Sequence, residues 1–224
     1  MSQSTPITYE SIRQDPTVQV YVERADRALC ALGYTEHSFA HVTRVATDAG
    51  HILEQLGAPA RTVELARIAG YLHDIGNVIN RIDHSQSGAV MAFRLLRERG
   101  MADEEVCTVI SAIGNHDEGT GVPVDEVSAA LILADKSDVR RSRVRQFDPL
   151  APDIHDRVNY AVTKSELRIN EVRTEIELCL TVDVSVSPIM EFFEIFTERM
   201  RLCRQAAARL GLVFRLRIND QILL

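Results

Sequence analysis

The spacing of apolar residues divides the chain into a long helical part and a shorter part that contains strands. From residue 17 to about residue 145, apolar side chains recur every three or four positions, as they do along the buried face of a helix. Glycine and proline residues interrupt this pattern at several points, most clearly at 57–59 and 119–123. The first part of the chain is therefore predicted to be an all-helical bundle.

Apolar and polar residues begin to alternate after the segment 146–152. Residues 176–184 and 212–219 show the period of two that is typical of half-buried strands. Residues 158–169 show it less regularly and are interpreted as a third strand. The end of the chain is therefore predicted to contain a small sheet.

A helix is predicted between the two clear strands, with Ser187 as its cap, Pro188 as its start and Gly211 as its stop. The fold class is thus mainly α: a helical bundle in residues 1–150 and a small C-terminal α+β unit, β-β-α-β, in residues 151–224. A sheet of this size cannot bury both its faces alone. We expect the unit to dock on the bundle as a lid or ligand sensor, or on a second copy in a homodimer.

Composition narrows the class of protein. The 224 residues carry 25 Lys and Arg against 32 Asp and Glu, a net charge of -7, which argues against a broad surface for nucleic acid. No apolar run approaches a membrane span, and the first residues lack the basic and apolar regions of a secretory leader. We expect a cytoplasmic protein that binds neither membranes nor long nucleic acids. Its cysteines lack paired spacing and are interpreted as free thiols: Cys30, Cys107, Cys179 and Cys203.

The most informative chemical feature is the pair His73-Asp74, in the run Ala69-Gly-Tyr-Leu-His-Asp-Ile-Gly76. A helix that ends in adjacent His and Asp can direct an imidazole nitrogen and a carboxylate oxygen at one divalent ion, and Gly76 suits a C-terminal cap. Further histidines and an aspartate flank the pair, in His41-Val-Thr-Arg-Val-Ala46, His84-Ser-Gln-Ser-Gly-Ala89, Ala112-Ile-Gly-Asn-His116-Asp117 and Leu131-Ile-Leu-Ala-Asp135-Lys136.

In this order of H, HD, H, H and D, the chain resembles the HD-domain superfamily of metal-dependent phosphohydrolases over residues 35 to 145. It is similar to the binuclear branch, in particular to HD-type diadenosine tetraphosphate hydrolases. The similarity to HD-GYP phosphodiesterases is more distant, because their Gly-Tyr-Pro signature is absent. The resemblance implies an HD-domain helical bundle with six metal ligands, which are His41, His73, Asp74, His84, His116 and Asp135.

Four imidazoles and two carboxylates give about three protein ligands to each of two ions, so each ion keeps positions for water and substrate. Two divalent transition-metal ions are expected, Fe or Mn first and Co, Ni or Zn as alternatives, because no Cys favours a soft site. Asp74 is the candidate bridge between them. His37, four residues before His41, is an alternative ligand that fits the family pattern less well, and Asp117 is a candidate contact of the metal-bound water.

The candidate catalytic residues are Asp74, Lys136 and Asp138. Many HD relatives carry a lysine that reaches phosphate at the position of Asn77. Arginines can replace such a cation, since each grips phosphate through two parallel hydrogen bonds. The candidate substrate-binding residues are Arg81 and members of the basic cluster after Asp135, namely Lys136, Arg140 and Arg141.

The predicted function is metal-dependent hydrolysis of a phosphoester or phosphoanhydride in a small nucleotide-like substrate, such as a dinucleoside polyphosphate. Two alternatives stay open. Some HD relatives with this ligand set hold two irons and use oxygen to cleave a carbon bond. An HD domain can also hold a structural metal and serve a non-catalytic binding or regulatory role.

Overall fold

The computed structural model describes residues 6–145 and 153–223. The predicted loop at 146–152 lies outside the described residues. The first part forms α1 (Tyr9–Arg13), α2 (Pro16–Ala31), α3 (Phe39–Leu56), α4 (Ala60–Leu72), α5 (His84–Glu98), α6 (Asp103–Gly114) and α7 (Glu126–Ser137), with the short 3-10 helices η1 (Ile75–Val78) and η2 (Arg141–Arg143). The second part forms α8 (Ile154–Ala161), β1 (Val162–Ile169), β2 (Glu175–Val182), α9 (Ile189–Arg209), β3 (Val213–Ile218) and β4 (Gln221–Ile222).

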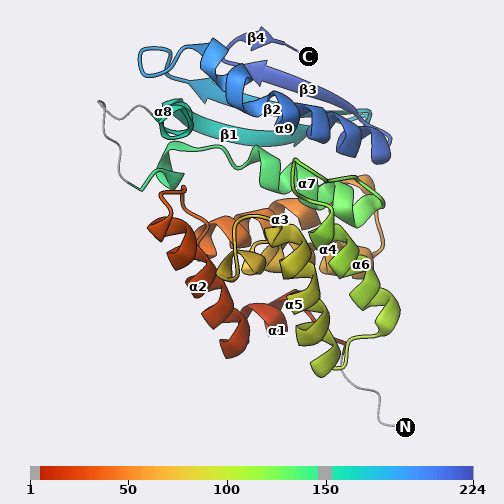
Figure 1. The fold of residues 1–224 in the computed structure, drawn as a ribbon. Helices are drawn as coiled ribbons and strands as arrows, with labels where there is room; N and C mark the ends of the chain where they lie inside the picture. The colour runs from red at the N-terminus through yellow and green to blue at the C-terminus, as the bar shows by residue number, and fades with distance from the viewer. Residues whose placement is uncertain (1–5, 146–152, 224) are drawn as a thin grey trace.

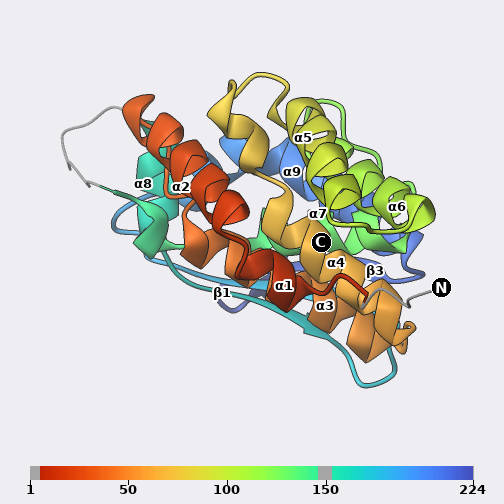
Figure 2. The ribbon, with the colours of Figure 1, turned by 90° about the horizontal axis from the view of Figure 1, so that it is seen from below.

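Helix α7 lies at the centre of the molecule. Every residue from Val127 to Ser137 is buried, because α3, α4 and α6 contact α7 from the helical layer while α9 and β1 contact it from the sheet layer. Figure 1 shows the sheet at one end of the molecule, with α7 between it and most of the helices. Seen from the helical end in Figure 2, α4 lies among α1, α3 and α6, all of which it contacts.

Capping side chains fix several helix ends. Asp15 and Ser38 each accept a hydrogen bond from a backbone N–H in the first turn of α2 and α3. Ser187, predicted to cap the long C-terminal helix, does not do so. Its hydroxyl donates to the carboxylate of Glu191, and Pro188 occupies the cap position of α9. Among the helices in the described ranges, none has the length and apolar character that crossing a membrane requires.

The sheet has the order β1-β2-β3-β4, in which β2 and β3 are parallel and the two outer pairs are antiparallel. Helix α9 connects the parallel strands and packs against both. The buried residues of β2 and β3 lie opposite one another, as Ile176 with Phe214, Leu178 with Leu216 and Leu180 with Ile218. The mainly helical fold with a small β-β-α-β unit is confirmed, and the short strand β4 is added to it.

The start of this unit differs from the sequence prediction. The strand predicted over 158–169 begins at Val162, because residues 154–161 form helix α8. The side chain of Asp153 caps this helix by accepting from the backbone N–H of His155. A local capping interaction therefore overrides the irregular alternation of apolar residues in this segment.

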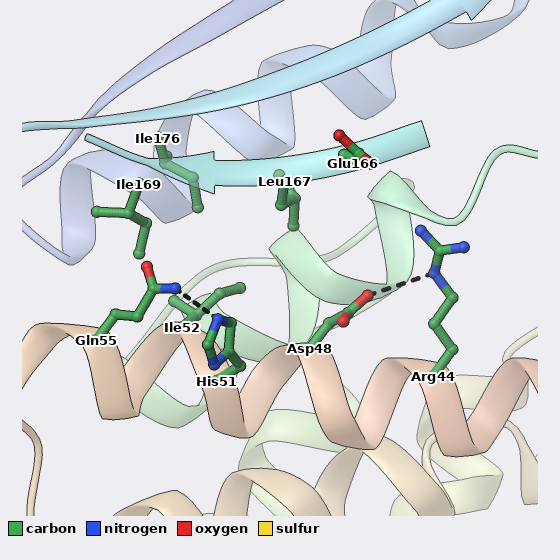
Figure 3. Close-up of a pocket in the computed structure, with 9 residues that line it drawn as sticks. All are labelled: Arg44, Asp48, His51, Ile52, Gln55, Glu166, Leu167, Ile169 and Ile176. Atoms are coloured by element: carbon green, nitrogen blue, oxygen red, sulfur yellow. Dashed lines mark hydrogen bonds and ion pairs between the residues drawn. The ribbon is translucent and has the colours of Figure 1, made fainter. Parts of the chain in front are cut away.

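The sheet unit docks on the helical part of the same chain. Leu167 and Ile169 of β1 and Ile176 of β2 point toward α3 across a hollow of about 160 Å³ (Figure 3). Buried side chains from both parts form one continuous apolar core. Docking on the helical bundle is therefore the observed arrangement, and the homodimer stays a prediction.

Gly70 allows the close packing of α4 on α3, and this contact provides a first test of the fold. A Cβ at Gly70 would lie 2.7 Å from the Cα of Ala46 and 2.8 Å from its backbone nitrogen. Gly70→Ala is expected to lower the free energy of unfolding by at least about 1–3 kcal/mol, because backbone atoms on both helices must move. Urea denaturation measures the change.

Gly114→Ala is the matched control. Its added Cβ would make an ordinary contact, 3.7 Å from Cβ of Ala89, in the last turn of α6, where alanine favours the helix by up to about 1 kcal/mol. Equal stability of the two variants would contradict the packing argument.

Candidate metal centre

Six side chains meet in the interior of the helical bundle, and they are the six ligands that the family resemblance implies. All six are buried, with at most 9% of the residue exposed. They form three overlapping groups whose potential ligand atoms lie within 4.8 Å of one another: His41, His73 and Asp74; His73, His116 and Asp135; and Asp74, His84 and His116. The ligands come from α3, the junction of α4 and η1, the start of α5, the end of α6, and α7.

Gly76 has a different role from the predicted helix cap. Helix α4 ends at Leu72, and the chain continues through His73 and Asp74 into η1, which contains Gly76. A Cβ at Gly76 would collide with the backbone carbonyl of His84. The glycine therefore lets the start of α5 approach η1, which places His84 beside Asp74.

Hydrogen bonds orient all four histidines in the same sense. The Nδ1 atoms of His73, His84 and His116 lie 2.6–3.1 Å from the backbone carbonyl oxygen of the residue three positions earlier. Nδ1 of His41 lies 2.8 Å from Oδ2 of Asp138. A carbonyl or carboxylate oxygen only accepts, so each Nδ1 carries the proton and donates. Each Nε2 is thereby left as the atom that can bind a metal.

Four donor atoms form a compact first group. Nε2 of His41 lies 3.6 Å from Oδ2 of Asp74 and 3.4 Å from Oδ1 of Asp135, and Nε2 of His73 lies 3.2 Å and 3.6 Å from the same two oxygens. Neighbouring donor atoms bound at about 2.0–2.2 Å to one tetrahedral or octahedral ion lie about 2.8–3.6 Å apart. The first group therefore has the dimensions of a coordination shell.

Three of the polar atoms in this first group lack a hydrogen-bond partner. Nε2 of His41, Nε2 of His73 and Oδ2 of Asp74 are buried without a hydrogen-bond partner, and they are the side-chain atoms for which this holds in the described part of the chain. A buried polar atom left unpaired costs about 1–3 kcal/mol. A metal ion would satisfy all three atoms.

The second group uses the other oxygen of Asp74. Oδ1 of Asp74 lies 3.5 Å from Nε2 of His84, which lies 3.1 Å from Nε2 of His116. Because both histidines carry their proton on Nδ1, the two Nε2 atoms face each other as lone pairs, and a cation between them would relieve this contact. Nη1 of Arg81 also lies 3.2 Å from Nε2 of His84, and Oδ1 of Asp74 accepts from Asn77 at 2.9 Å.

The charges of the cluster also favour a cation. Burial disfavours the carboxylate forms, but His73 outweighs it for Asp74 and Lys136 outweighs it for Asp135, so the pKa of each carboxyl stays well below its usual range. Burial lowers the pKa of the His116 imidazole, which is therefore neutral. Burial lowers the pKa of His73 as well, but Asp74 and Asp135 outweigh it and raise that pKa to about 10. A bound metal would replace the proton that His73 otherwise holds.

Asp138 and Lys136, two of the candidate catalytic residues, lie behind candidate metal ligands rather than among them. Asp138 is fully buried and accepts from His41, on the side of the ring away from the cluster. The ammonium of Lys136 lies 2.7 Å from Oδ2 of Asp135, the oxygen that does not face the histidines. These contacts orient His41 and Asp135, and the catalytic roles of Asp138 and Lys136 stay predictions.

A cleft of about 460 Å³ lies beside the cluster, although none of the six candidate ligands is among the residues that line it. Its wall includes Arg81, which contacts His84, and His37, whose ring lies 5.3 Å from that of His41. The remaining polar groups of the wall include Glu118, Arg143 and Arg199. The sequence did not single out Glu118 or Arg199, since Arg199 lies 125 positions after Asp74 in a helix whose pattern shows only its apolar face. His37 does not belong to any of the ligand groups.

The other predicted substrate-binding residues lie elsewhere. The guanidinium of Arg140 donates to Asp138 and Ser142, and that of Arg141 donates to the carbonyl of Tyr160. Both line a separate hollow together with Arg44. The structure therefore brings Arg81 to the cleft, places Lys136 behind Asp135, and does not bring Arg140 or Arg141 there. Asp117 does not belong to any ligand group either.

Asp138→Asn tests whether Asp138 orients a metal ligand. The amide keeps the shape of the carboxylate but loses its charge, so the hydrogen bond that fixes His41 weakens. We expect metal affinity to fall by about 10- to 100-fold, the usual effect of losing such an orienting group. Competition with a chelator of known affinity measures it.

Asp48→Asn is the control. Asp48 pairs with Arg44 at 3.4 Å, as Asp138 does, but it does not contact a candidate ligand. Equal metal affinity in the two variants would show that Asp138 has no such role.

One of three comparisons with known proteins covers this site with a family model. A family model described as the HD domain matches residues 38–156, which is more than half of the chain and includes all six clustered side chains. An uncharacterised protein of Methanocaldococcus jannaschii is 23% identical over 208 residues, covering 82% of this chain and 80% of its own. A crystal structure of a predicted HD superfamily hydrolase from an uncultured Thermotogales bacterium is 26% identical, with a TM-score of 0.44 over 55% of this chain and 67% of its own. Because the family model matches more than half of its residues, the chain belongs to the HD domain family.

Proposed function

We propose that this chain is a hydrolase that uses two divalent transition-metal ions to cleave a phosphoester or phosphoanhydride bond in a small nucleotide-like molecule. The observation that carries the proposal is the convergence of four imidazole Nε2 atoms and two buried carboxylates, with every Nδ1 committed to an oxygen acceptor. Such a set of nitrogen and oxygen ligands suits Fe or Mn first, with Co, Ni and Zn as alternatives.

Each ion would have its own set of ligands. His41, His73 and Asp135 would hold one ion, His84 and His116 the other, and Asp74 would offer one oxygen to each, since its two oxygens face the two groups separately. Two such ions would lower the pKa of a bound water toward about 7 and neutralise charge on a phosphoryl group. The protein's own residues would orient these donors, keep both carboxylates ionised and hold the set out of bulk water.

The cleft beside the cluster supports a small anionic substrate. Its volume of about 460 Å³ falls within the range of small-molecule sites. Arg81, Arg143 and Arg199 contribute positive charge to a wall that also contains Glu118, Asp153 and Asp156, and the exposed ring of Tyr34 provides an apolar surface. A nucleotide combines these two properties, because it carries phosphates and a planar base. The resemblance to diadenosine tetraphosphate hydrolases favours a substrate with several phosphates in a row.

The two ions are expected to bind with different affinities. The first group offers four donor atoms, whereas the second offers three, of which two already contact Arg81 or Asn77. The protein purified without oxygen should hold about two transition-metal ions per chain. Dialysis against a chelator should remove one before the other, as elemental analysis would show.

Variants assign these ions to their ligands. The double variant His84→Ala with His116→Ala should retain one ion, and His41→Ala should lose the tighter one. Only one equivalent in the unaltered protein at saturating metal would leave His84 and His116 without a ligand role.

Asp74→Ala tests the hydrolytic proposal itself. Because Asp74 faces both groups, the variant should lose both ions and release phosphate from nucleotides at the background rate. The measurement is a phosphate-release screen over nucleoside mono-, di- and triphosphates and dinucleoside polyphosphates.

Asp48→Ala is the matched control, since Asp48 is a carboxylate of the bundle that pairs with Arg44 and belongs to none of the ligand groups, and it should remain active. If the metal-loaded protein released no phosphate from any compound and consumed oxygen instead, hydrolysis would be the wrong function.

A further inference from the structure

Arg199 of α9 brings the C-terminal unit to the candidate site. Its side chain is 21% exposed and lines the cleft beside the metal cluster. Its Nε atom donates to Oε1 of Glu118 at 2.7 Å, and its guanidinium carbon lies 4.3 Å from the centre of the Phe196 ring. These two contacts fix both the position and the plane of the guanidinium.

The end edge of this guanidinium remains free. Within the described part of the chain, Nη1 and Nη2 of Arg199 have no hydrogen-bond partner, and neither atom is buried without one. Two parallel N–H groups on a fixed plane match the oxygens of a phosphate or carboxylate. The free edge therefore has the geometry for a bidentate contact with an anion in the cleft.

A chain of alternating charges joins Arg199 to a metal ligand. Glu118 Oε1 lies 3.6 Å from the ammonium of Lys136, which lies 2.7 Å from Oδ2 of Asp135. Lys136 therefore shares the negative charge of Glu118, so Glu118 does not by itself cancel the charge of Arg199. The same contacts hold Arg199 at a fixed distance from Asp135, as a substrate-binding residue requires.

A second guanidinium in the cleft resembles the first. Arg81 lies over the ring of Tyr34 at 5.6 Å and has no carboxylate partner among the residues that the structure describes. Arg81 comes from the helical part and Arg199 from the sheet unit, and both line the same cleft. Two arginines from different parts of the fold thus surround the space beside the metal cluster.

We propose that Arg199 binds a phosphate group of the substrate through Nη1 and Nη2, which makes the C-terminal unit part of the substrate site. This inference rests on the proposed function for the identity of the anion. It adds a specificity-determining residue from outside the part of the chain that the HD family model matches, residues 38–156. The substrate class that fits is an organic phosphate with at least two phosphoryl groups, one at the metals and one at Arg199.

The test is the affinity of the metal-loaded, full-length protein for inorganic pyrophosphate, measured by isothermal titration calorimetry. Arg199→Gln should weaken binding by about 10- to 100-fold, the usual range for a charge-assisted bidentate contact. The affinity of Arg199→Lys should lie between that of the unaltered protein and that of Arg199→Gln, because lysine keeps the charge but not the planar pair of donors. Metal content should be the same in all variants.

Arg157→Gln is the matched control. Like Arg199, Arg157 belongs to the C-terminal unit and pairs with one glutamate, in this case Glu191 at 2.8 Å, and its side chain is 30% exposed. Unlike Arg199, it does not line the cleft. The control should bind pyrophosphate like the unaltered protein. If Arg199→Gln folds poorly because Glu118 loses its partner, the double variant Arg199→Gln with Glu118→Gln removes both charges and should show the same loss of affinity.

The outcomes separate this inference from the proposed function. Equal pyrophosphate affinity in the Arg199 variants and the Arg157 control, or no binding by the unaltered protein, would overturn the role of Arg199, even if the enzyme hydrolyses phosphoesters. Binding that depends on Arg199, in a protein that hydrolyses nothing in the phosphate-release screen, would support the anion site and refute the hydrolytic function alone.

Discussion

Two carboxylates buried among four imidazoles are the constraint on which the rest of this structure depends. Asp74 and Asp135 lose most contact with water. Asn77 donates to Oδ1 of Asp74 and the ammonium of Lys136 lies beside Oδ2 of Asp135, but toward the cluster both carboxylates face histidine Nε2 atoms, which carry no proton unless His73 is protonated. Such an interior is costly without a positive ion. A cation in the space that the six side chains enclose would offset this cost, and metal binding would then stabilise the fold.

Helix ends supply the orientation that the cluster needs. His73 and His116 follow the last residues of α4 and α6, where carbonyl groups lack helical partners, and each donates Nδ1–H to the carbonyl three residues earlier. His84 uses the same i−3 contact in the turn before α5. One local interaction therefore satisfies a backbone group and directs Nε2 inward. His41 lies near the start of α3, which is why it needs the side chain of Asp138 instead.

The convergence of these six side chains could be predicted because they occur in a recognisable order along the chain, and the helical pattern around them is regular. The cleft could not be predicted in the same way. Glu118, Arg143 and Arg199 come from three separate segments, and Arg199 reaches the cleft because α9 packs against α7. Sequence proximity to Asp135 favoured Arg140 and Arg141, but the chain turns away after α7, and their guanidinium groups bind nearby acceptors. Three-dimensional proximity here depends on the C-terminal unit, which has no motif of its own.

Helix α7 explains why that unit matters to the site. An α7 covered on one side only would expose apolar residues between Val127 and Ala134, which α9 and β1 now bury. The same layer holds the end of α7 directly, since the hydroxyl of Ser165 in β1 donates to the carbonyl of Ser137 at 2.5 Å. Asp135 and Lys136 lie in that last turn. A displacement of the sheet unit would therefore shift Asp135 as well as Arg199, so the candidate metal centre and the cleft depend on the same packing.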